Sequence, residues 1–267
     1  MTPAKCLTSF VTRPLTHLGR AAFRFVFPPS CPLCQRDVEL RERDGFDRLI
    51  APVLCDQCSA EMQPLESRQC PRCGLPVGPF ARTDAGCPNC RTLSFRFRGV
   101  IRAGLYDGTL RMACIRAKGA TQFPLAAALA NWMWTREQDE FDAESIDVVV
   151  AVPRHWTRQV ARPHHAAETM ARVLARRLRR PHGRGVLRKI RWTPDQSDLT
   201  AANRKLNLKD AFAVRPRPRL LAGKTVLLVD DILTTGTTAN ECSRALLHAG
   251  AAKVVVAVIA VVPPSSR

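Results

Sequence analysis

The segment Val226–Thr238 constrains the fold of this chain more than any other stretch. It begins with four apolar residues, typical of a buried parallel strand, and two carboxylates, Asp230 and Asp231, follow at the strand's expected carboxyl end. A Thr/Gly loop then opens a predicted helix that ends near His248. Backbone N–H groups at a helix N-terminus converge on an anion, and hydroxyls add donors. The segment therefore predicts a phosphate-binding loop, formed by Thr234, Thr235, Gly236, Thr237 and Thr238.

The two carboxylates extend this prediction from a phosphate to a sugar phosphate. Asp230 and Asp231 can accept hydrogen bonds from ribose hydroxyls or help to hold Mg²⁺. Two other interpretations are weaker. An ordinary helix cap needs one Asp or Thr, whereas this loop has two Asp and four Thr around one Gly. A P-loop would use Gly223–Thr225, but the Gly expected five positions earlier is Pro218, and the tripeptide precedes its strand.

Eight of the eleven cysteines form four Cys-x-x-Cys pairs, a spacing that places two thiolates on one zinc knuckle. Consecutive pairing predicts two zinc ribbons with two structural zinc ions. A cross-braced pairing, first pair with third and second with fourth, is also compatible with the spacing. Redox chemistry is the rival interpretation, and four repeats in one Pro-rich stretch argue against it. The eight are Cys31, Cys34, Cys55, Cys58, Cys70, Cys73, Cys87 and Cys90.

Length and hydropathy predict one α/β domain plus a small module in a chain of 267 residues. We expect an N-terminal helix or arm over residues 1–30, a double zinc ribbon over 31–92 and the α/β domain over 93–267. The longest apolar run, Val254–Val262, is too short for a membrane span and suits a buried strand. Residues 1–27 lack the apolar core of a secretory signal, so a reducing cytoplasm is the expected location, with organelle targeting as the alternative.

Positive charge is concentrated in one quarter of the chain. The formal net charge is +18, and residues 154–219 hold 18 Lys and Arg against 4 Asp and Glu, a net +14. Such a concentration indicates a surface patch that attracts polyanions. The alternative is a solvated, arginine-rich sequence from a compositionally biased genome, because Arg is also frequent elsewhere in the chain.

Strand and helix patterns alternate from about Ser94 onward, which predicts a parallel sheet with ligands outside the carboxyl ends of the strands. The predicted strands are 99–106, 146–152, 226–231 and 254–262. The predicted helices are 110–118, 125–134, 164–180 and the one that ends near 248. The strands at 146–152 and 226–231 should end at the same edge, and a loop at Pro153–His155 follows the first of them.

The phosphate-loop segment resembles the phosphoribosyl pyrophosphate (PRPP) motif of type I phosphoribosyltransferases. From Phe27 to Val262 the chain resembles the ComF (competence protein F) family, which joins a double zinc ribbon to a phosphoribosyltransferase-like domain. The motifs that carry the resemblance are Cys31 to Cys34, Tyr106 to Gly108 with Lys118–Gly119, Val152–Pro153, Gln196 with Leu199, Arg204 and Asn207, Ala211–Phe212, Val226–Thr238 and Ala249–Ala251.

The resemblance implies a type I phosphoribosyltransferase-like fold, α/β with a parallel sheet, and PRPP bound together with magnesium. It implies that Arg154 lies at the pyrophosphate loop and that Lys118 reaches the pyrophosphate, which makes these two the candidate catalytic residues. It also implies a role in natural transformation, with single-stranded DNA and competence-machinery proteins as partners in the cytoplasm. Trp156 and Trp192 are candidates for base stacking.

One block departs from the family pattern. Where Arg-Gly-Phe-Asn-Gln is expected, the chain has Arg162 to Ala166, with Pro163, His164 and His165 in the middle. Pro suits the first turn of a helix, so the fold should survive. We expect the two histidines to be exposed helix residues; the alternative is that they replace the lost polar contacts to ligand.

Three functions remain open from the sequence. The chain is a PRPP-binding accessory protein that acts on DNA, a phosphoribosyltransferase with an unidentified acceptor, or a nucleotide-salvage enzyme. Transfer from PRPP needs positioning and charge neutralisation rather than a nucleophilic side chain, so the lack of a catalytic triad excludes none of them. No acceptor signature is recognisable, which counts against salvage.

Overall fold

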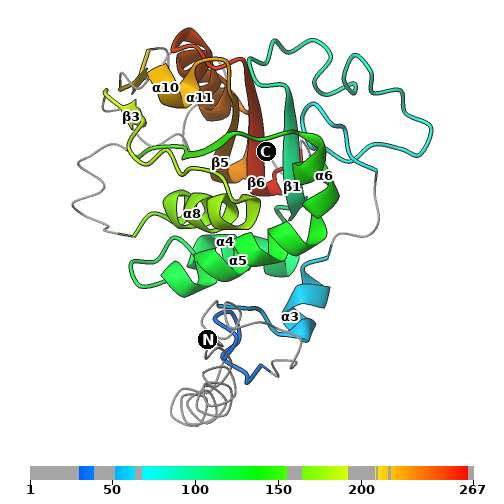
Figure 1. Cartoon of the computed structure of the whole chain (residues 1–267). Coiled ribbons are helices and arrows are strands. Elements are labelled where there is room, and N and C mark those ends of the chain that lie inside the picture. The colour runs from blue at the N-terminus through cyan, green and yellow to red at the C-terminus, as the bar shows by residue number, and fades with distance from the viewer. Residues whose placement is uncertain are drawn as a thin grey trace, which may run out of the picture.

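The computed structural model describes residues 30–38, 52–63, 68–154, 164–191, 208, 210–215 and 218–263. The arm expected over residues 1–30 lies almost wholly outside this range, as do His155, Trp156 and Trp192. Within the described part of the chain, no helix is long and apolar enough to cross a membrane. Figure 1 shows a central sheet with helices on both sides.

Four parallel strands form the central sheet, as the alternating pattern predicted. The order is β1 (Gly99–Leu105), β6 (Lys253–Val261), β5 (Thr225–Leu233) and β2 (Val148–Ala151). β5 pairs with β2 on one side and β6 on the other, with Ala151 opposite Val229 and Val229 opposite Ala257. The apolar runs at 226–229 and 254–262 therefore form the two central strands, which are buried on both faces, the position where continuous apolar runs are expected.

One face of the sheet is covered by helices α4 (Gly108–Arg116), α5 (Phe123–Arg136) and α8 (Ala166–Leu178). Odd-numbered residues such as Leu227 and Val229 point to this face, because side chains of a strand alternate between its two faces. Cys31 and Cys58 of the first four cysteines belong to the same hydrophobic cluster and Cys55 packs against it, together with Leu54 and Met62 on either side of α3 (Asp56–Glu61). The short α6 (Gln138–Ala143) follows α5 and contributes Phe141.

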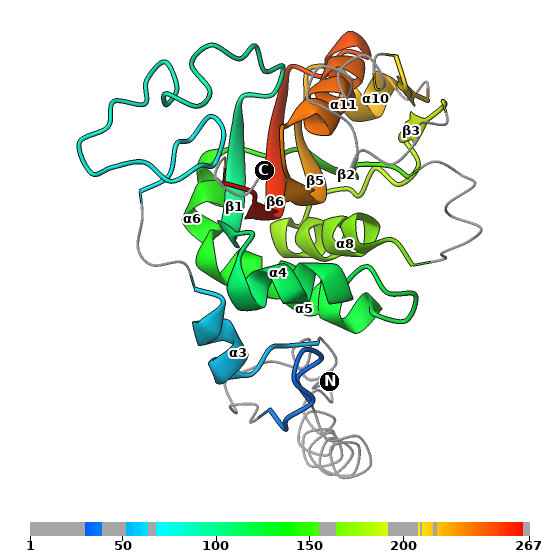
Figure 2. The same cartoon turned by 180° about the vertical axis from the view of Figure 1, so that it is seen from behind.

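The opposite face is covered by α11 (Thr237–His248), α10 (Pro218–Leu221) and a small antiparallel pair, β3 (Leu187–Lys189) with β4 (Phe212–Val214). Even-numbered residues such as Val226 and Leu228 point here, and the last four cysteines of the motif pack in the same cluster. Figure 2 shows α11 and α10 on the other side of the sheet from α4, α5 and α8. The first group of cysteines thus packs on the helical layer of one face and the second on the opposite side of the sheet, an arrangement that spacing did not reveal.

Backbone of the second cysteine group lies directly against β1. The amide of Val100 donates to the carbonyl of Pro71 at 2.9 Å, and a Cβ built on Gly99 would lie 2.7 Å from that same oxygen. Such a contact is shorter than real Cβ atoms show, and its partner is backbone rather than a flexible side-chain end. Gly99 therefore permits the close approach of the Cys70–Cys73 turn to the sheet.

We predict that Gly99→Ala destabilises the protein by about 1–3 kcal/mol, because the added methyl overpacks this contact. Thermal unfolding of the purified protein measures the loss. Gly78→Ala is the matched control, since nothing lies within 4 Å of a Cβ at that exposed position and its φ is not positive. Equal stability of the two variants would contradict this account of the contact.

Candidate functional site

The acid pair lies beyond the end of the neighbouring strand. β2 ends at Ala151, opposite Val229, whereas β5 continues through Asp230 and Asp231 to Leu233. The carboxyl end of the strand thus lies two residues further along than the sequence predicted, because pairing with β6 continues past the carboxylates. Since β2 has already ended, the two aspartates lie at an open corner of the sheet, next to the residues that follow Ala151.

Lys118 is brought to this corner by the turn that ends α4. Its Nζ lies 3.2 Å from Oδ2 of Asp231, and the side chains of Lys118 and Asp231 are 40% and 16% exposed. Burial works to lower the pKa of Lys118, but the attraction of Asp231, aided by Asp230, outweighs it and raises that pKa. The ammonium therefore stays charged at neutral pH and partly neutralises the acid pair.

Asp230 has the most perturbed carboxyl group of this corner. Burial is the main cause that raises its pKa well above the ordinary range, and the neighbouring carboxylate of Asp231 adds to the rise. The amide of Asp231 donates to Asp230 Oδ1 at 2.9 Å and works in the opposite direction. Two adjacent carboxyl groups, one of them paired with the Lys118 ammonium, offer the oxygen ligands that a hard metal ion prefers.

The loop after β5 leads into the N-terminus of α11 (Thr237–His248). Gly236 is the N-cap of α11 with φ 76° and ψ 0°, a left-handed conformation that favours glycine. The hydroxyl oxygens of Thr235 and Thr237 lie 2.9 Å apart, and α11 has no acidic residue in its first turn. The positive end of this 12-residue helix therefore faces the loop without a competing carboxylate.

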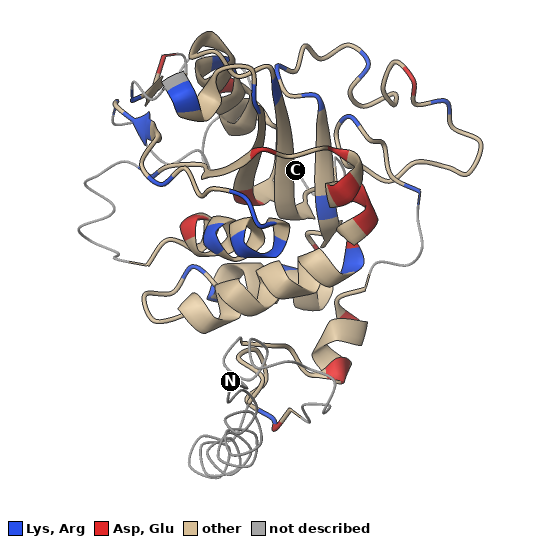
Figure 3. Ribbon diagram, viewed as in Figure 1, with Lys and Arg blue, Asp and Glu red and all other residues tan. Residues whose placement is uncertain are grey.

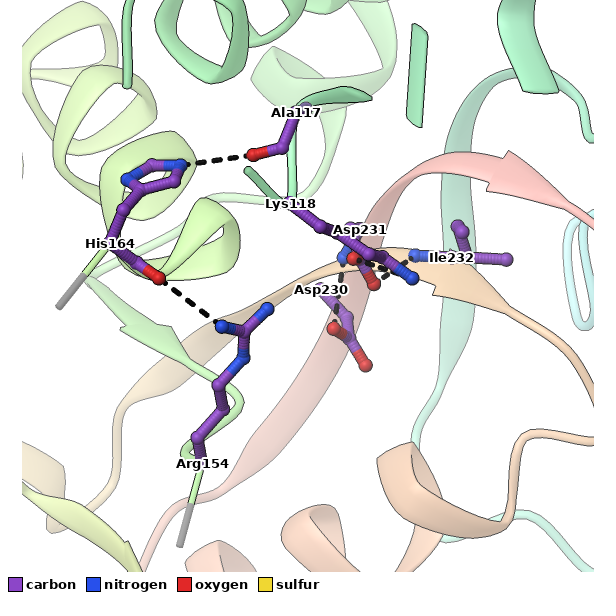
Figure 4. Close-up of polar contacts among 7 residues, drawn as sticks. All are labelled: Ala117, Lys118, Arg154, His164, Asp230, Asp231 and Ile232. Atoms are coloured by element: carbon purple, nitrogen blue, oxygen red, sulfur yellow. Dashed lines mark hydrogen bonds and ion pairs between the residues drawn. The ribbon is translucent and has the colours of Figure 1, made fainter. Parts of the chain in front are cut away.

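Arg154 and His164 form the other wall of the corner. Nη1 of Arg154 donates to the carbonyl oxygen of His164 at 3.2 Å, and Nε2 of His164 lies 3.0 Å from the carbonyl oxygen of Ala117 (Figure 4). The expected exposure of the two histidines is wrong for His164, which is only 9% exposed, because its ring packs against the end of α4. His165 is half-buried, and burial, with a contribution from Arg154, lowers its pKa to about 4.

A basic cavity of about 580 Å³ adjoins Arg154 at the carboxyl end of β2. Arg184, Arg188 and Lys189 line it from the segment that leads into and forms β3, and His165 lines it from the start of α8. Among the described residues that line it, Glu168 is the one acidic side chain, and its Oε1 lies 3.7 Å from Arg184 Nε and 3.5 Å from His182 Nε2. The balance of charge favours an anionic occupant.

The eight cysteines of the four pairs form two groups of four, and in each group all sulfurs lie within 4.8 Å of one another. The pairing is consecutive, so the structure resolves the alternative that spacing left open. The sulfur–sulfur distance is 3.6 Å between Cys34 and Cys55, 3.7 Å between Cys70 and Cys90, and 3.5 Å between Cys73 and Cys87. A tetrahedron of sulfurs about 2.3 Å from zinc has edges of about 3.8 Å, so the thiols fit zinc.

Several features of the site were not found from the sequence. The burial of His164 depends on a carbonyl 47 residues away, and the basic cavity depends on β3, a three-residue strand without a recognisable pattern. The one available signal was the departure from the family pattern at Pro163–His165, which marked the position but not its environment.

Two family descriptions match the chain. The phosphoribosyl transferase domain matches residues 122–266, and the double zinc ribbon domain matches residues 22–91. The chain belongs to the phosphoribosyl transferase domain family. The expected zinc ribbons are confirmed by the second match and by the two cysteine tetrads, which support structural zinc.

Known relatives of this phosphoribosyltransferase-like chain confirm the resemblance to competence protein F. Competence protein F of Haemophilus influenzae is 27% identical over 200 residues, which cover 74% of this chain and 85% of that protein. The DNA utilization protein YhgH of Salmonella typhi is 28% identical over 208 residues, which cover 75% and 87%. A solved glutamine PRPP amidotransferase from B. subtilis is 22% identical with a TM-score of 0.34, and the match covers 51% of this chain and 27% of that one.

We predict that the protein purified under reducing conditions carries about two zinc ions per chain, because two tetrads close two tetrahedral shells. Cys87→Ser should lower the content to about one, whereas Cys114→Ala should leave it at two, since Cys114 is buried outside both tetrads. Elemental analysis measures the content. Less than one zinc in the wild type would rule out the assignment.

Proposed function

We propose that this protein binds PRPP together with Mg²⁺ at the corner formed by β5, the loop 234–238 and Lys118. One observation carries the proposal: the two adjacent carboxylates of β5 lie beyond the point where β2 ends, and the same strand leads directly into a left-handed Gly236 loop at a helix N-terminus. The loop supplies N–H donors for a phosphate, and the carboxylates suit ribose hydroxyls and a hard cation.

The remaining side chains suit the pyrophosphate of the same ligand. Lys118 and Arg154 both lie at this corner, and the basic cavity beside Arg154 extends the positive region away from the loop. When a metal ion binds the carboxylates in place of the Lys118 ammonium, that ammonium can leave Asp231 and contact a pyrophosphate oxygen instead. If the chain transfers the phosphoribosyl group, these cations would stabilise the leaving pyrophosphate. No contact in the described residues favours nucleotide salvage over binding alone.

We predict that Gly236→Ala weakens the binding of Mg²⁺ and PRPP at least tenfold. The added methyl strains the left-handed backbone and lies 3.2 Å from Cε1 of Phe95, so the loop must shift. Gly223→Ala is the matched control, because Gly223 also has a positive φ (69°) but nothing lies within 4 Å of its Cβ. Calorimetry that finds equal affinity for the two variants would place the phosphate site elsewhere.

We also predict that the affinity for Mg²⁺ and PRPP increases with pH. Because its pKa is raised, the Asp230 carboxyl of the free protein stays protonated at pH values at which an aspartate is usually ionised. A metal ion requires the ionised form. At pH values below the raised pKa, binding therefore releases a proton, and at higher pH it does not. Asp230→Asn should weaken binding and remove this dependence. Calorimetry in buffers of different ionisation enthalpy measures the released proton, and an unchanged pH profile in the variant would contradict the assignment.

We further propose that the protein acts on single-stranded DNA, in a competence-related role in the cytoplasm with other proteins of that machinery. The names of the relatives support this role, as does the positive charge between residues 154 and 219. In Figure 3, Lys and Arg are grouped on α8. Arg172 and Arg176 are exposed on α8, and Arg179 and Arg180 are exposed directly after its end. Arg177, in contrast, donates to Oδ1 of Asn131 at 2.8 and 2.9 Å and joins α8 to α5.

We predict that replacing the four exposed arginines Arg172, Arg176, Arg179 and Arg180 with Ala flattens the salt dependence of DNA binding. Each lost phosphate contact should lower the slope of log affinity against log salt by about 0.7 for a single strand. Affinity for PRPP should stay unchanged. Replacing Arg82, Arg91, Arg96 and Arg98, four exposed arginines in or next to the second cysteine group, is the matched control. If the slope changes only in the control variant, the DNA site lies on the zinc ribbon. If the wild type does not bind DNA at low salt, the proposed DNA role is wrong.

A further inference from the structure

His164 joins the two walls of the candidate site through both its side chain and its backbone. The ring Nε2 lies 3.0 Å from the carbonyl oxygen of Ala117, and the carbonyl oxygen of His164 accepts from Arg154 Nη1 at 3.2 Å. Because the partner of the ring is a carbonyl, Nε2 must carry the hydrogen and donate it. Figure 4 shows His164 between Arg154 on one side and the Ala117–Lys118 turn on the other.

The carbonyl that accepts from His164 belongs to the end of α4. Ala117 is the C-cap of that helix, where carbonyl groups lose their intrahelical partners. The same peptide unit leads into Lys118, whose amide donates to the carbonyl of Ile115 at 3.2 Å, while the amide of Gly119 donates to Arg116 at 2.9 Å. Holding the Ala117 carbonyl therefore fixes the peptide plane from which the Lys118 side chain starts.

The position of the Lys118 ammonium depends on such a fixed backbone. A lysine side chain has four rotatable bonds and about 2 kcal/mol of rotamer entropy, so its ammonium reaches one partner well only when its backbone is held. In this structure the ammonium reaches Asp231 Oδ2 at 3.2 Å although the Lys118 side chain is 40% exposed. The contacts that hold the turn include the amide bonds within it, the bond from the Ala117 amide to the carbonyl of Ala113 at 2.9 Å, and the bond from the His164 ring, which is the side-chain contact to the Ala117 carbonyl.

We infer that His164 is a positioning residue that holds the α4 turn so that Lys118 faces the acid pair, and that it couples this turn to Arg154. The inference rests on the proposed function, because the position of Lys118 matters through the ligand that the corner binds. His164 donates to backbone and not to ligand, so its effect passes through Lys118. The residue that departs from the family pattern thus supplies a connection between two candidate ligand-binding cations.

The test compares His164→Met, which removes the donor at similar size, with His164→Gln, whose amide can still donate. Amide hydrogen exchange of Lys118 and Gly119 in the free protein measures whether the turn is held. Loss of one hydrogen bond should accelerate this exchange about tenfold in the Met variant and less than about twofold in the Gln variant. His248→Met is the matched control, because His248 is exposed at the far end of α11.

Affinity for Mg²⁺ and PRPP forms the second arm. His164→Met should weaken binding about five- to tenfold, His164→Gln should restore it to within about twofold, and in a Lys118→Met background His164→Met should add less than about twofold. Equal losses in the Met and Gln variants, or full additivity with Lys118→Met, would overturn the inference. If the wild type does not bind PRPP, the proposed function fails, while the exchange measurement still decides whether His164 holds the turn.

Discussion

Parallel pairing of β5 between β2 and β6 is the constraint on which the candidate site depends. It directs the carboxyl ends of three strands to one edge and buries the central strand on both faces, so β5 cannot shift without moving both neighbours. The last residue of β2, Ala151, pairs with Val229, which directly precedes Asp230. On that side of β5, therefore, no β2 residue pairs with the two aspartates. The loop that follows lies at the start of α11, and its position is set by the packing of α11 on the even-numbered side chains of the sheet.

The two cysteine tetrads extend this core rather than forming a separate one. The first packs with α4 and α5, and the second packs with β1 and the face that carries α11. Metal at the first tetrad would stabilise the surroundings of α4, the helix that ends at Lys118, and Arg116 of that helix donates to the carbonyl of Leu33 at 2.7 Å. The rings of Phe95 and Phe97 stack with their centroids 4.5 Å apart, and they lie beside Gly236, between the second tetrad and the phosphate loop. Each ribbon therefore contacts a different element of the candidate site.

Local patterns in the sequence were sufficient for the sheet and for the loop. The apolar runs predicted the two central strands, because full burial requires continuous hydrophobic residues, and the Thr/Gly loop predicted the start of α11. Cysteine spacing predicted two metal sites, but it could not distinguish consecutive from cross-braced pairing, which depends on the path of the chain in space. β3 and β4 were missed because three-residue strands give no periodicity. The burial of His164 and the bond from Arg177 to Asn131 were missed because both depend on tertiary contacts between helices.

The position of a bound ligand tests the account most directly. We would titrate Mg²⁺ and PRPP into isotope-labelled protein and follow the backbone amide signals by NMR. We expect the largest shifts at Thr234–Thr238 and at Asp230, Asp231 and Lys118, with smaller shifts at Arg154. Shifts confined to the cysteine tetrads, or to the exposed arginines of α8, would contradict the assignment of the β5 corner as the ligand site.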